Sequence, residues 1–162
     1  MSNRFLAAFG IGLVLIAVAV AGVLYMQRGA HVDLPGKVLK VRTAPLDENS
    51  SVAVIDFRAS NPSDYPFVIR TVSVILEDPD GAQHPSGAAS DADAKALFQA
   101  IPLLGEKYNQ TMMMKETIPA HGSVDRMVAA RFEAPESRLE ARKRLIVRIE
   151  EIDGKVFELS DK

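Results

Sequence analysis

Two patterns of hydrophobic and polar positions divide the chain. Residues 5–26 read FLAAFGIGLVLIAVAVAGVLYM, and no charged residue lies between Arg4 and Arg28. From residue 37 onward, short apolar segments are separated by Gly, Pro, Asn and Asp, which is typical of strands joined by turns. The pattern therefore predicts an N-terminal tail at 1–4, a transmembrane helix at 5–26, a tether at 27–36 and a β-sandwich domain at 37–162.

The apolar run is long enough to span a bilayer. As a helix, residues 5–26 extend over about 33 Å, and a hydrocarbon core is about 30 Å thick. A cleaved signal peptide is the alternative, because Ala17-Val18-Ala19 and Ala19-Val20-Ala21 resemble cleavage sites, but the run exceeds the usual length of a signal-peptide apolar region. We expect an uncleaved single-pass anchor that contacts the lipid bilayer through residues 5–26.

The charges beside this run do not settle its orientation. Arg4 lies on one side and Arg28 on the other, and long domains are translocated largely regardless of charge. We expect a protein of the cell membrane with its C-terminal domain extracytoplasmic. A cytoplasmic domain is the alternative.

The region after the tether reads as seven strands with one helical insertion. The predicted strands are Lys37–Thr43, Ser51–Ser60, Phe67–Leu76, Tyr108–Ile118, Val124–Phe132 and the two arms of a C-terminal hairpin. Residues 82–89 read as a loop. A helix is expected at about 90–101, with Ser90 as its N-cap, and residues 135–144 as one or two helical turns.

The C-terminal hairpin has a predictable register. A three-residue loop, Ile152-Asp153-Gly154, with Gly in the left-handed conformation places Glu151 opposite Lys155 and Arg148 opposite Glu158. The same register sets two apolar pairs, Ile149 with Phe157 and Val147 with Leu159. Together these elements predict a mainly β fold, a seven-stranded immunoglobulin-like antiparallel β-sandwich.

One segment carries a family resemblance. The run SVAVIDFRASNPSDYPFVIRTVSVIL, with Asn61 and Pro62 at its centre, resembles the strand–Asn-Pro–strand unit of the late-embryogenesis-abundant type 2 proteins, also called the water-stress and hypersensitive-response domain. The resemblance covers about a third of the chain. It implies a sandwich without a catalytic centre, and it transfers no binding residues.

Composition excludes several kinds of chemistry. The chain has no Cys, which removes disulfides, thiolate metal sites and cysteine nucleophiles. A net charge of −2 argues against a nucleic-acid partner. Three histidines, His31, His84 and His121, are too widely spaced for a local zinc motif, and no serine lies in a nucleophile elbow. We therefore expect no catalytic, cofactor-binding or metal-binding residue and no enzymatic activity.

Two clusters offer groups that could bind a ligand. Met112-Met113-Met114 offers thioethers that suit Cu(I), yet core packing explains methionines more simply, and a strand would turn Met112 and Met114 to one face and Met113 to the other. The acidic residues of 78–93 do not follow a calcium-loop spacing. Basic residues of 138–144 alternate with Glu residues, which favours a solvated surface.

The sequence thus predicts a membrane-anchored, non-enzymatic β-sandwich module for protein interaction or envelope structure. The expected partners are other membrane or envelope proteins. The alternative is an accessory domain that binds a small ligand or a metal near residues 82–114.

Overall fold

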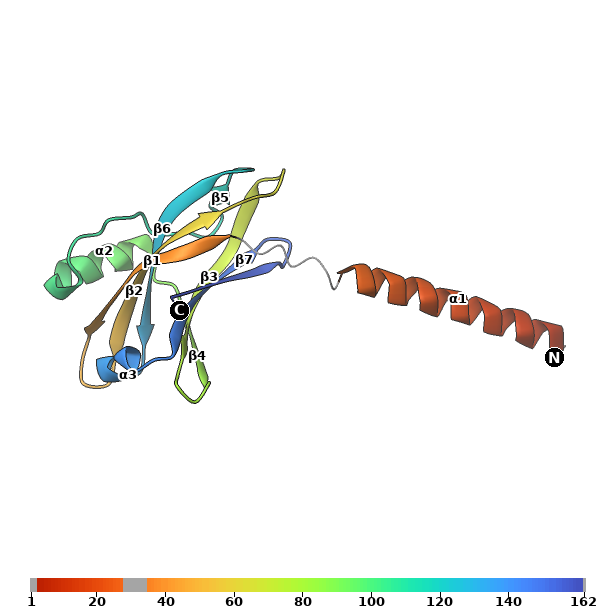
Figure 1. Ribbon diagram of the computed structural model, residues 1–162, viewed down its shortest axis with the longest axis horizontal. Coiled ribbons are helices and arrows are strands. Elements are labelled where there is room, and N and C mark those ends of the chain that lie inside the picture. The colour runs from red at the N-terminus through yellow and green to blue at the C-terminus, as the bar shows by residue number, and fades with distance from the viewer. Residues whose placement is uncertain (1–2, 28–34, 162) are drawn as a thin grey trace. The chain divides into compact units, whose positions relative to one another are not determined.

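The structure is a computed structural model, and it describes residues 3–27 and 35–161. In the first of these stretches, side chains are described at residues 9–10 and 12–22. The chain divides into two compact units, Met1–Val32 and Asp33–Lys162. The first contains helix α1, and the second, the β unit, contains all the described strands (Figure 1).

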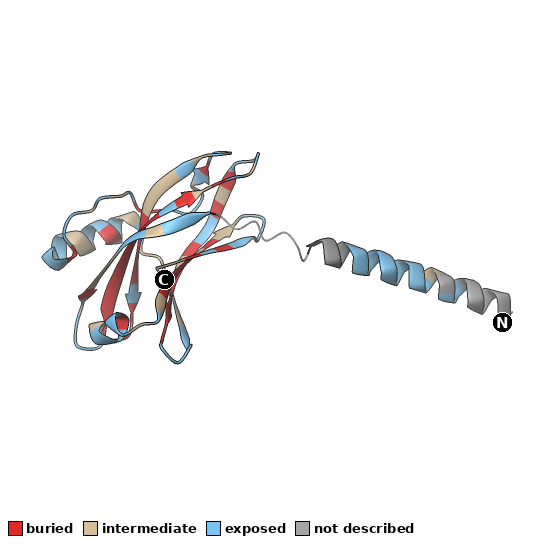
Figure 2. Ribbon diagram, in the orientation of Figure 1, coloured by how far each residue is buried: buried red, intermediate tan, exposed pale blue. Residues whose placement is uncertain are grey.

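Helix α1 spans Asn3–Gln27. Its described large apolar side chains, from Phe9 to Val20, are more than half exposed, as Figure 2 shows in pale blue. A search of the described residues finds no helix that is both long enough and apolar enough to cross a membrane. The transmembrane helix at 5–26 therefore stays a prediction. The tether at 27–36 falls mainly on residues 28–34, which lie outside the described residues, as does His31.

The β unit holds eight strands and three short helices among its described residues. The strands are β1 (Gly36–Pro45), β2 (Ser51–Ser60), β3 (Phe67–Glu77), β4 (Gln83–Gly87), β5 (Thr117–Ile118), β6 (Ser123–Phe132), β7 (Arg144–Glu151) and β8 (Val156–Ser160). The helices are α2 (Asp91–Ala100), η1 (Pro102–Leu104, a 3-10 helix) and α3 (Glu136–Glu140).

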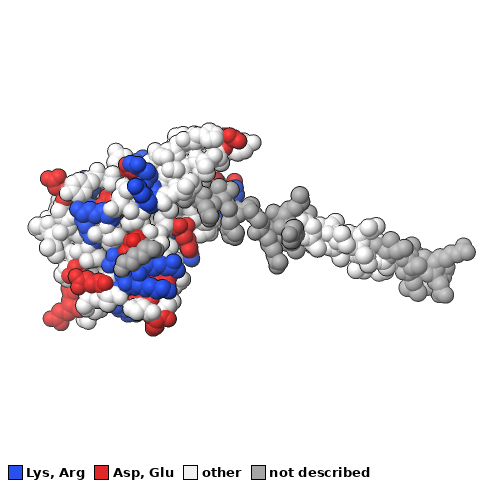
Figure 3. Space-filling model, in the orientation of Figure 1, with Lys and Arg blue, Asp and Glu red and all other residues white. Residues whose placement is uncertain are grey.

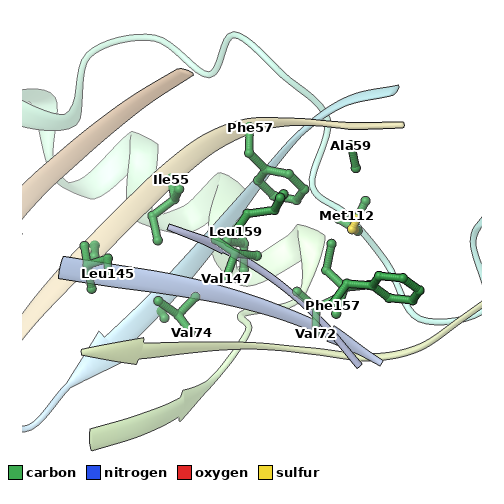
Figure 4. Packing of buried hydrophobic residues seen from close by; sticks show 14 of the residues in the cluster. Ile55, Phe57, Ala59, Val72, Val74, Met112, Leu145, Val147, Phe157 and Leu159 are labelled. Carbon is green, nitrogen blue, oxygen red and sulfur yellow. The ribbon is translucent and has the colours of Figure 1, made fainter. Parts of the chain in front are cut away.

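The strands form two antiparallel sheets. One sheet has the order β1-β2-β6, and the other has the order β4-β3-β7-β8, with β5 also paired to β3. The two sheets pack their apolar faces together around a core that includes Phe57 from β2, Val74 from β3 and Val147 from β7 (Figure 4). Phe67 and Phe157 meet edge to face there, with ring centroids 4.8 Å apart.

A second apolar cluster covers the outer face of the β1-β2-β6 sheet. Val52 and Val54 of β2 point away from the main core and pack against α2 and Leu104 of η1. The predicted N-cap is confirmed, since Ser90 Oγ accepts a hydrogen bond from the backbone N–H of Asp93 at 3.1 Å. Because the insertion covers this face, β2 is buried on both sides along most of its length.

The predicted hairpin register is confirmed. Ile149 lies opposite Phe157, Val147 opposite Leu159 and Arg148 opposite Glu158. The backbone N–H of Glu151 donates to the carbonyl of Lys155 at 2.8 Å. Gly154 has φ of 85°, the left-handed conformation that this bulged loop requires.

Two predicted elements are wrong, and the strand count rises from seven to eight. Residues 82–89 are not a loop, because 83–87 form β4 and extend the sheet beyond β3. Residues 108–118 are not one strand. Only Thr117–Ile118 pairs as β5, and Thr111 forms an isolated parallel bridge with Met127.

The predicted solvated basic surface is confirmed in part, since Arg138 and Lys143 are 43% and 55% exposed but Arg142 is only 14% exposed. Several basic residues of 138–144 bind acidic side chains that are far away in the sequence. Lys143 and Arg144 both contact Glu77 at 2.6 Å, and Arg142 contacts Asp161 at 2.7 Å. On the face shown in Figure 3, basic and acidic side chains are interspersed over the β unit.

Candidate functional site: a groove lined by methionines

A groove opens in the β unit between the start of α2 and the segment after residue 111. It has a volume of about 320 Å³ and is lined mainly by apolar groups. We call it the methionine groove, and its lining residues are Thr71, Val72, Ala88, Ala89, Ser90, Asp91, Met112, Met113 and Met114. It lies within the region 82–114 that the sequence marks as the alternative ligand site.

The groove lies beside an irregular stretch of β3, where the backbone of Ile69 is hydrogen-bonded to Lys115 and Glu116. β5 pairs with Phe67 and Val68, and β4 pairs with residues 73–77. Between them, the register of β3 against β7 shifts between Ile69 and Thr71. Thr71 and Val72 follow this irregularity and form one wall of the groove.

The three methionines have different surroundings. Met112 is 3% exposed and belongs to the main core, where Figure 4 shows it at the same end as Phe157. Met113 and Met114 are 54% and 68% exposed. The predicted strand arrangement, with Met112 and Met114 sharing one face, is therefore wrong.

A turn that is stabilised by hydrogen bonds and an ion pair holds the two exposed methionines toward solvent. The backbone N–H of Glu116 donates to the carbonyl of Met113 at 3.3 Å, and Lys115 has φ of 65°, which few side chains adopt. The Glu116 carboxylate accepts a hydrogen bond from the backbone N–H of Met113 at 3.2 Å and pairs with Arg126 at 2.6 Å. The exposure of these methionines is thus built into the turn.

The opposite wall of the groove ends in a charged corner. Asp91, the first residue of α2, contacts Lys107 and Lys95 at 2.7 Å each and accepts a hydrogen bond from Thr111 at 2.9 Å. Hydrogen bonds from Lys107, Lys95 and Thr111 hold the pKa of Asp91 far below its ordinary value. These contacts therefore connect the start of α2 to the segment 107–111.

A buried ion pair fixes the segment that leads into the groove. Arg42 and Asp56 are 9% and 3% exposed, and they meet at 2.7 Å. Arg42 also donates to the carbonyls of Leu104 and Glu106, at 2.7 Å each, and its guanidinium lies 5.0 Å from the centre of the Phe98 ring. Asp56 accepts a further hydrogen bond from the side chain of Asn109 at 2.8 Å.

A second, more polar cavity of about 490 Å³ lies at β4 and contains His84, Arg131, Glu133 and Arg138 in its lining. Arg138 is held by Asp78 at 2.5 Å and lowers the pKa of that carboxyl, while burial opposes the shift. Since Arg138 is paired with Asp78 and Arg131 lies 4.0 Å from Asp47, both arginines of the cavity already face a carboxylate.

The two described histidines bind neighbouring carboxylates. His84 Nε2 lies 3.0 Å from Asp78, and His121 Nε2 lies 2.9 Å from Asp64. Neither histidine lines the methionine groove. Within residues 3–27 and 35–161, no three His, Cys, Asp or Glu side chains are grouped so that they could hold a metal ion.

Comparison of the chain with family models, with curated proteins and with solved structures gave no match. What the groove can do therefore follows from its geometry. An apolar, half-open hollow with two projecting thioethers can bind an apolar group, because the flexible and polarisable Met side chain adapts to differently shaped partners. The methionine run was visible in the sequence, whereas its exposure depends on the turn.

Proposed function

We propose that this chain is a single-pass membrane protein whose β unit is a non-enzymatic interaction module, and that it binds a segment of another membrane or envelope protein in the methionine groove. The observation that carries this proposal is the pair of methionines held outward beside an apolar hollow. The two methionines share the groove with other apolar lining residues, and contiguous exposed apolar surface often marks an interaction site.

Three features support the membrane anchor. Residues 5–26 carry no charge. Residues 3–27 form one helix, and its described apolar side chains are exposed rather than packed. A helix of this composition is stable where its side chains contact lipid. The domain then lies outside the cytoplasm, with a cytoplasmic location as the alternative.

The strand order supports an immunoglobulin-like sandwich as the finer fold. In that fold the first, second, fourth and fifth strands form one sheet, and the third, sixth and seventh form the other. Here β1-β2-β6 corresponds to the first sheet without its fourth strand, and β3-β7-β8 corresponds to the second, with β4 added at its edge. The Asn-Pro unit between β2 and β3 agrees with the resemblance to the late-embryogenesis-abundant type 2 domain, which implies no catalytic centre.

The groove suits an extended segment that carries one apolar side chain. The backbones of Ile69 and Val72 are already hydrogen-bonded to residues 115–116 and to Ala88. The segment is therefore held by its inserted side chain and not by addition of a strand to β3. Val72, Ala88 and Ala89 contribute apolar lining. The methionines then cover the inserted side chain.

Crosslinking in native membranes tests the docking site. A photo-crosslinking amino acid at Thr71, an exposed groove residue, is expected to capture one membrane or envelope protein. The same residue at Leu39, which is 43% exposed on β1, serves as the control and is expected to capture none. The double variant Met113→Glu/Met114→Glu should abolish capture from Thr71. Equal capture from both positions, or capture that survives the double variant, would refute the groove as the docking site.

A reporter enzyme fused after Lys162 tests the orientation. A reporter that is active only outside the cytoplasm should be active. Activity of a cytoplasm-specific reporter would reverse the assignment.

A small apolar ligand is the second candidate for the groove. Its volume of about 320 Å³ lies at the lower end of the range for small-molecule sites, about 300–1,000 Å³. Native mass spectrometry of the purified chain distinguishes the candidates. A bound small molecule that is lost in Met113→Glu/Met114→Glu would favour this function, and an unliganded chain would favour the protein partner.

A further inference from the structure

We propose that Met113 and Met114 form a reversible oxidation site, at which a peroxide converts both thioethers to sulfoxides and makes the mouth of the methionine groove polar. The effect of oxidation on docking rests on the function proposed above. The oxidation itself does not.

The sulfur chemistry of the chain is concentrated in its methionines. There is no Cys, so thioethers are the only sulfur groups that an oxidant can attack. Met113 and Met114 are 54% and 68% exposed, whereas Met112 and Met127 are 3% and 0% exposed. Oxidation of methionine requires access to the sulfur, so the four described methionines divide into two reactive and two protected residues.

The reactive pair stays accessible in the folded state. The turn that carries it is held by the hydrogen bond from Glu116 to Met113 and by the Glu116–Arg126 ion pair. Accessibility therefore does not require the sheet to open. Because neither side chain is buried, adding an oxygen atom to each leaves the core packing unchanged.

The reaction is a two-electron transfer. A sulfur lone pair attacks one oxygen of hydrogen peroxide, an S–O bond forms, the O–O bond breaks, and the second oxygen leaves as water. Sulfur is oxidised and the peroxide is reduced. A methionine sulfoxide reductase reverses the step by taking two electrons from a dithiol, and the oxygen leaves as water.

Oxidation changes the apolar lining of the groove. Met113 and Met114 are the flexible part of this lining, which also includes Val72, Ala88 and Ala89. A sulfoxide is polar and chiral whereas a thioether is apolar, so an apolar side chain in the groove loses part of its apolar cover. Docking is then expected to weaken under peroxide and to recover after reduction.

Peptide mass spectrometry of the full-length chain after graded hydrogen peroxide tests the site. Fragment ions that separate residues 112, 113 and 114 should show sulfoxide at Met113 and Met114 forming roughly ten-fold faster than at Met112 and Met127. Both sulfoxides should disappear after treatment with methionine sulfoxide reductases. Oxidation of Met112 and Met127 at the same rate as the exposed pair, or resistance of all four, would overturn the proposal.

Two further measurements complete the test. The melting temperature after selective oxidation should match that of the untreated chain, and a large fall would show that the pair supports the fold instead. Capture from Thr71 should drop after peroxide in the native chain but persist in Met113→Leu/Met114→Leu, which keeps the apolar surface without sulfur. Unchanged capture in the oxidised native chain would refute the effect on docking. Absence of capture even from the reduced chain would refute the proposed function, while the oxidation rates still decide the site.

Discussion

Replacing Asn61 with Ala tests how the turn between β2 and β3 is held. Asn61 is 3% exposed and follows directly after β2. Its side-chain N–H groups donate to the carbonyls of Tyr65 at 2.7 Å, Pro119 at 3.1 Å and Ile118 at 3.2 Å. Its side-chain oxygen accepts hydrogen bonds from the backbone and the hydroxyl of Ser63. One amide therefore connects the β2–β3 turn to the segment between β5 and β6.

The expected loss follows from these contacts. A hydrogen bond contributes about 1 kcal/mol net, and a buried carbonyl left without its donor costs about 1–3 kcal/mol. The bonds to Ser63 lie near solvent, so water replaces them in part. Water replaces least well the hydrogen bonds that Asn61 donates to the carbonyls of Ile118 and Pro119. We expect Asn61→Ala to lower the free energy of unfolding by about 2–3 kcal/mol, which corresponds to a fall of about 10 °C in melting temperature.

Thermal and urea unfolding of the full chain, followed by circular dichroism, measures this effect. Asn49→Ala, at an exposed position, is the matched control and should stay within about 0.5 kcal/mol of the parent. Asn61→Asp is the sharper variant, since it directs a carboxylate oxygen at three carbonyl oxygens, and it should be less stable than Asn61→Ala at neutral pH. A melting temperature for Asn61→Ala equal to that of the parent would refute this account of the turn.

Three other changes probe the charged groups. Asp56→Ala removes the partner of buried Arg42 and should cost about 3–5 kcal/mol in urea unfolding; Asp125→Ala, which breaks an exposed pair with Arg58, should have a much smaller effect. Arg138 lowers the pKa of Asp78, so the stabilisation from this pair is present above the ordinary carboxyl pKa of about 4 and is lost as pH falls through the lowered value. The urea midpoint of Arg138→Gln should therefore fall less steeply in acid than that of the parent, and an unchanged slope would contradict this. Burial raises the pKa of Glu151, so the ionised carboxylate lowers stability as pH rises through that raised value. Glu151→Gln should be more stable than the parent at pH 7 but not below about pH 4. Equal urea midpoints at pH 7 would argue against the burial.

The sequence correctly predicted the elements that are held mainly by contacts between residues close in the sequence. The hairpin of β7 and β8 followed from Gly154 together with apolar and charged pairs that agree on one register. Helix α2 followed from a Ser90 cap and an apolar stripe. The alternation in β2 gave its bounds at Ser51 and Ser60. In the hairpin and the helix cap, neighbours in the sequence are also the contacting groups, whereas β2 pairs with the distant β6.

The two elements that the sequence predicted wrongly, at 82–89 and 108–118, depend on contacts with residues far away in the sequence. β4 reads QHPSG, which has little strand propensity, yet Ser86 donates to the carbonyl of Arg131 and Ala88 bridges to Ala130. Residues 108–118 look like a strand by composition. Arg42 and Asp56 instead bind the carbonyl of Glu106 and the side chain of Asn109, which fixes the path of the preceding chain.

The sequence predicted the region of the groove but not its geometry, for the same reason. The run of three methionines marks the region, but nothing in its spacing says which of them face solvent. That depends on the left-handed Lys115 and on Arg126, which is ten positions beyond Glu116 and pairs with it through the fold. The acids that bind Arg138 and Lys143 were missed likewise, because Asp78 and Glu77 lie on the far side of the insertion in the sequence.

The proposed anchor and the small size of the groove are consistent with each other. A hollow of about 320 Å³ admits one apolar side chain, so contacts within it give a weak and rapidly reversible complex between free molecules. If α1 holds the chain in the bilayer, a partner in the same membrane meets the groove at an effective concentration that can reach the millimolar range. Weak binding is then sufficient for occupancy, and a small loss of apolar surface, such as oxidation of two thioethers, is enough to reverse it.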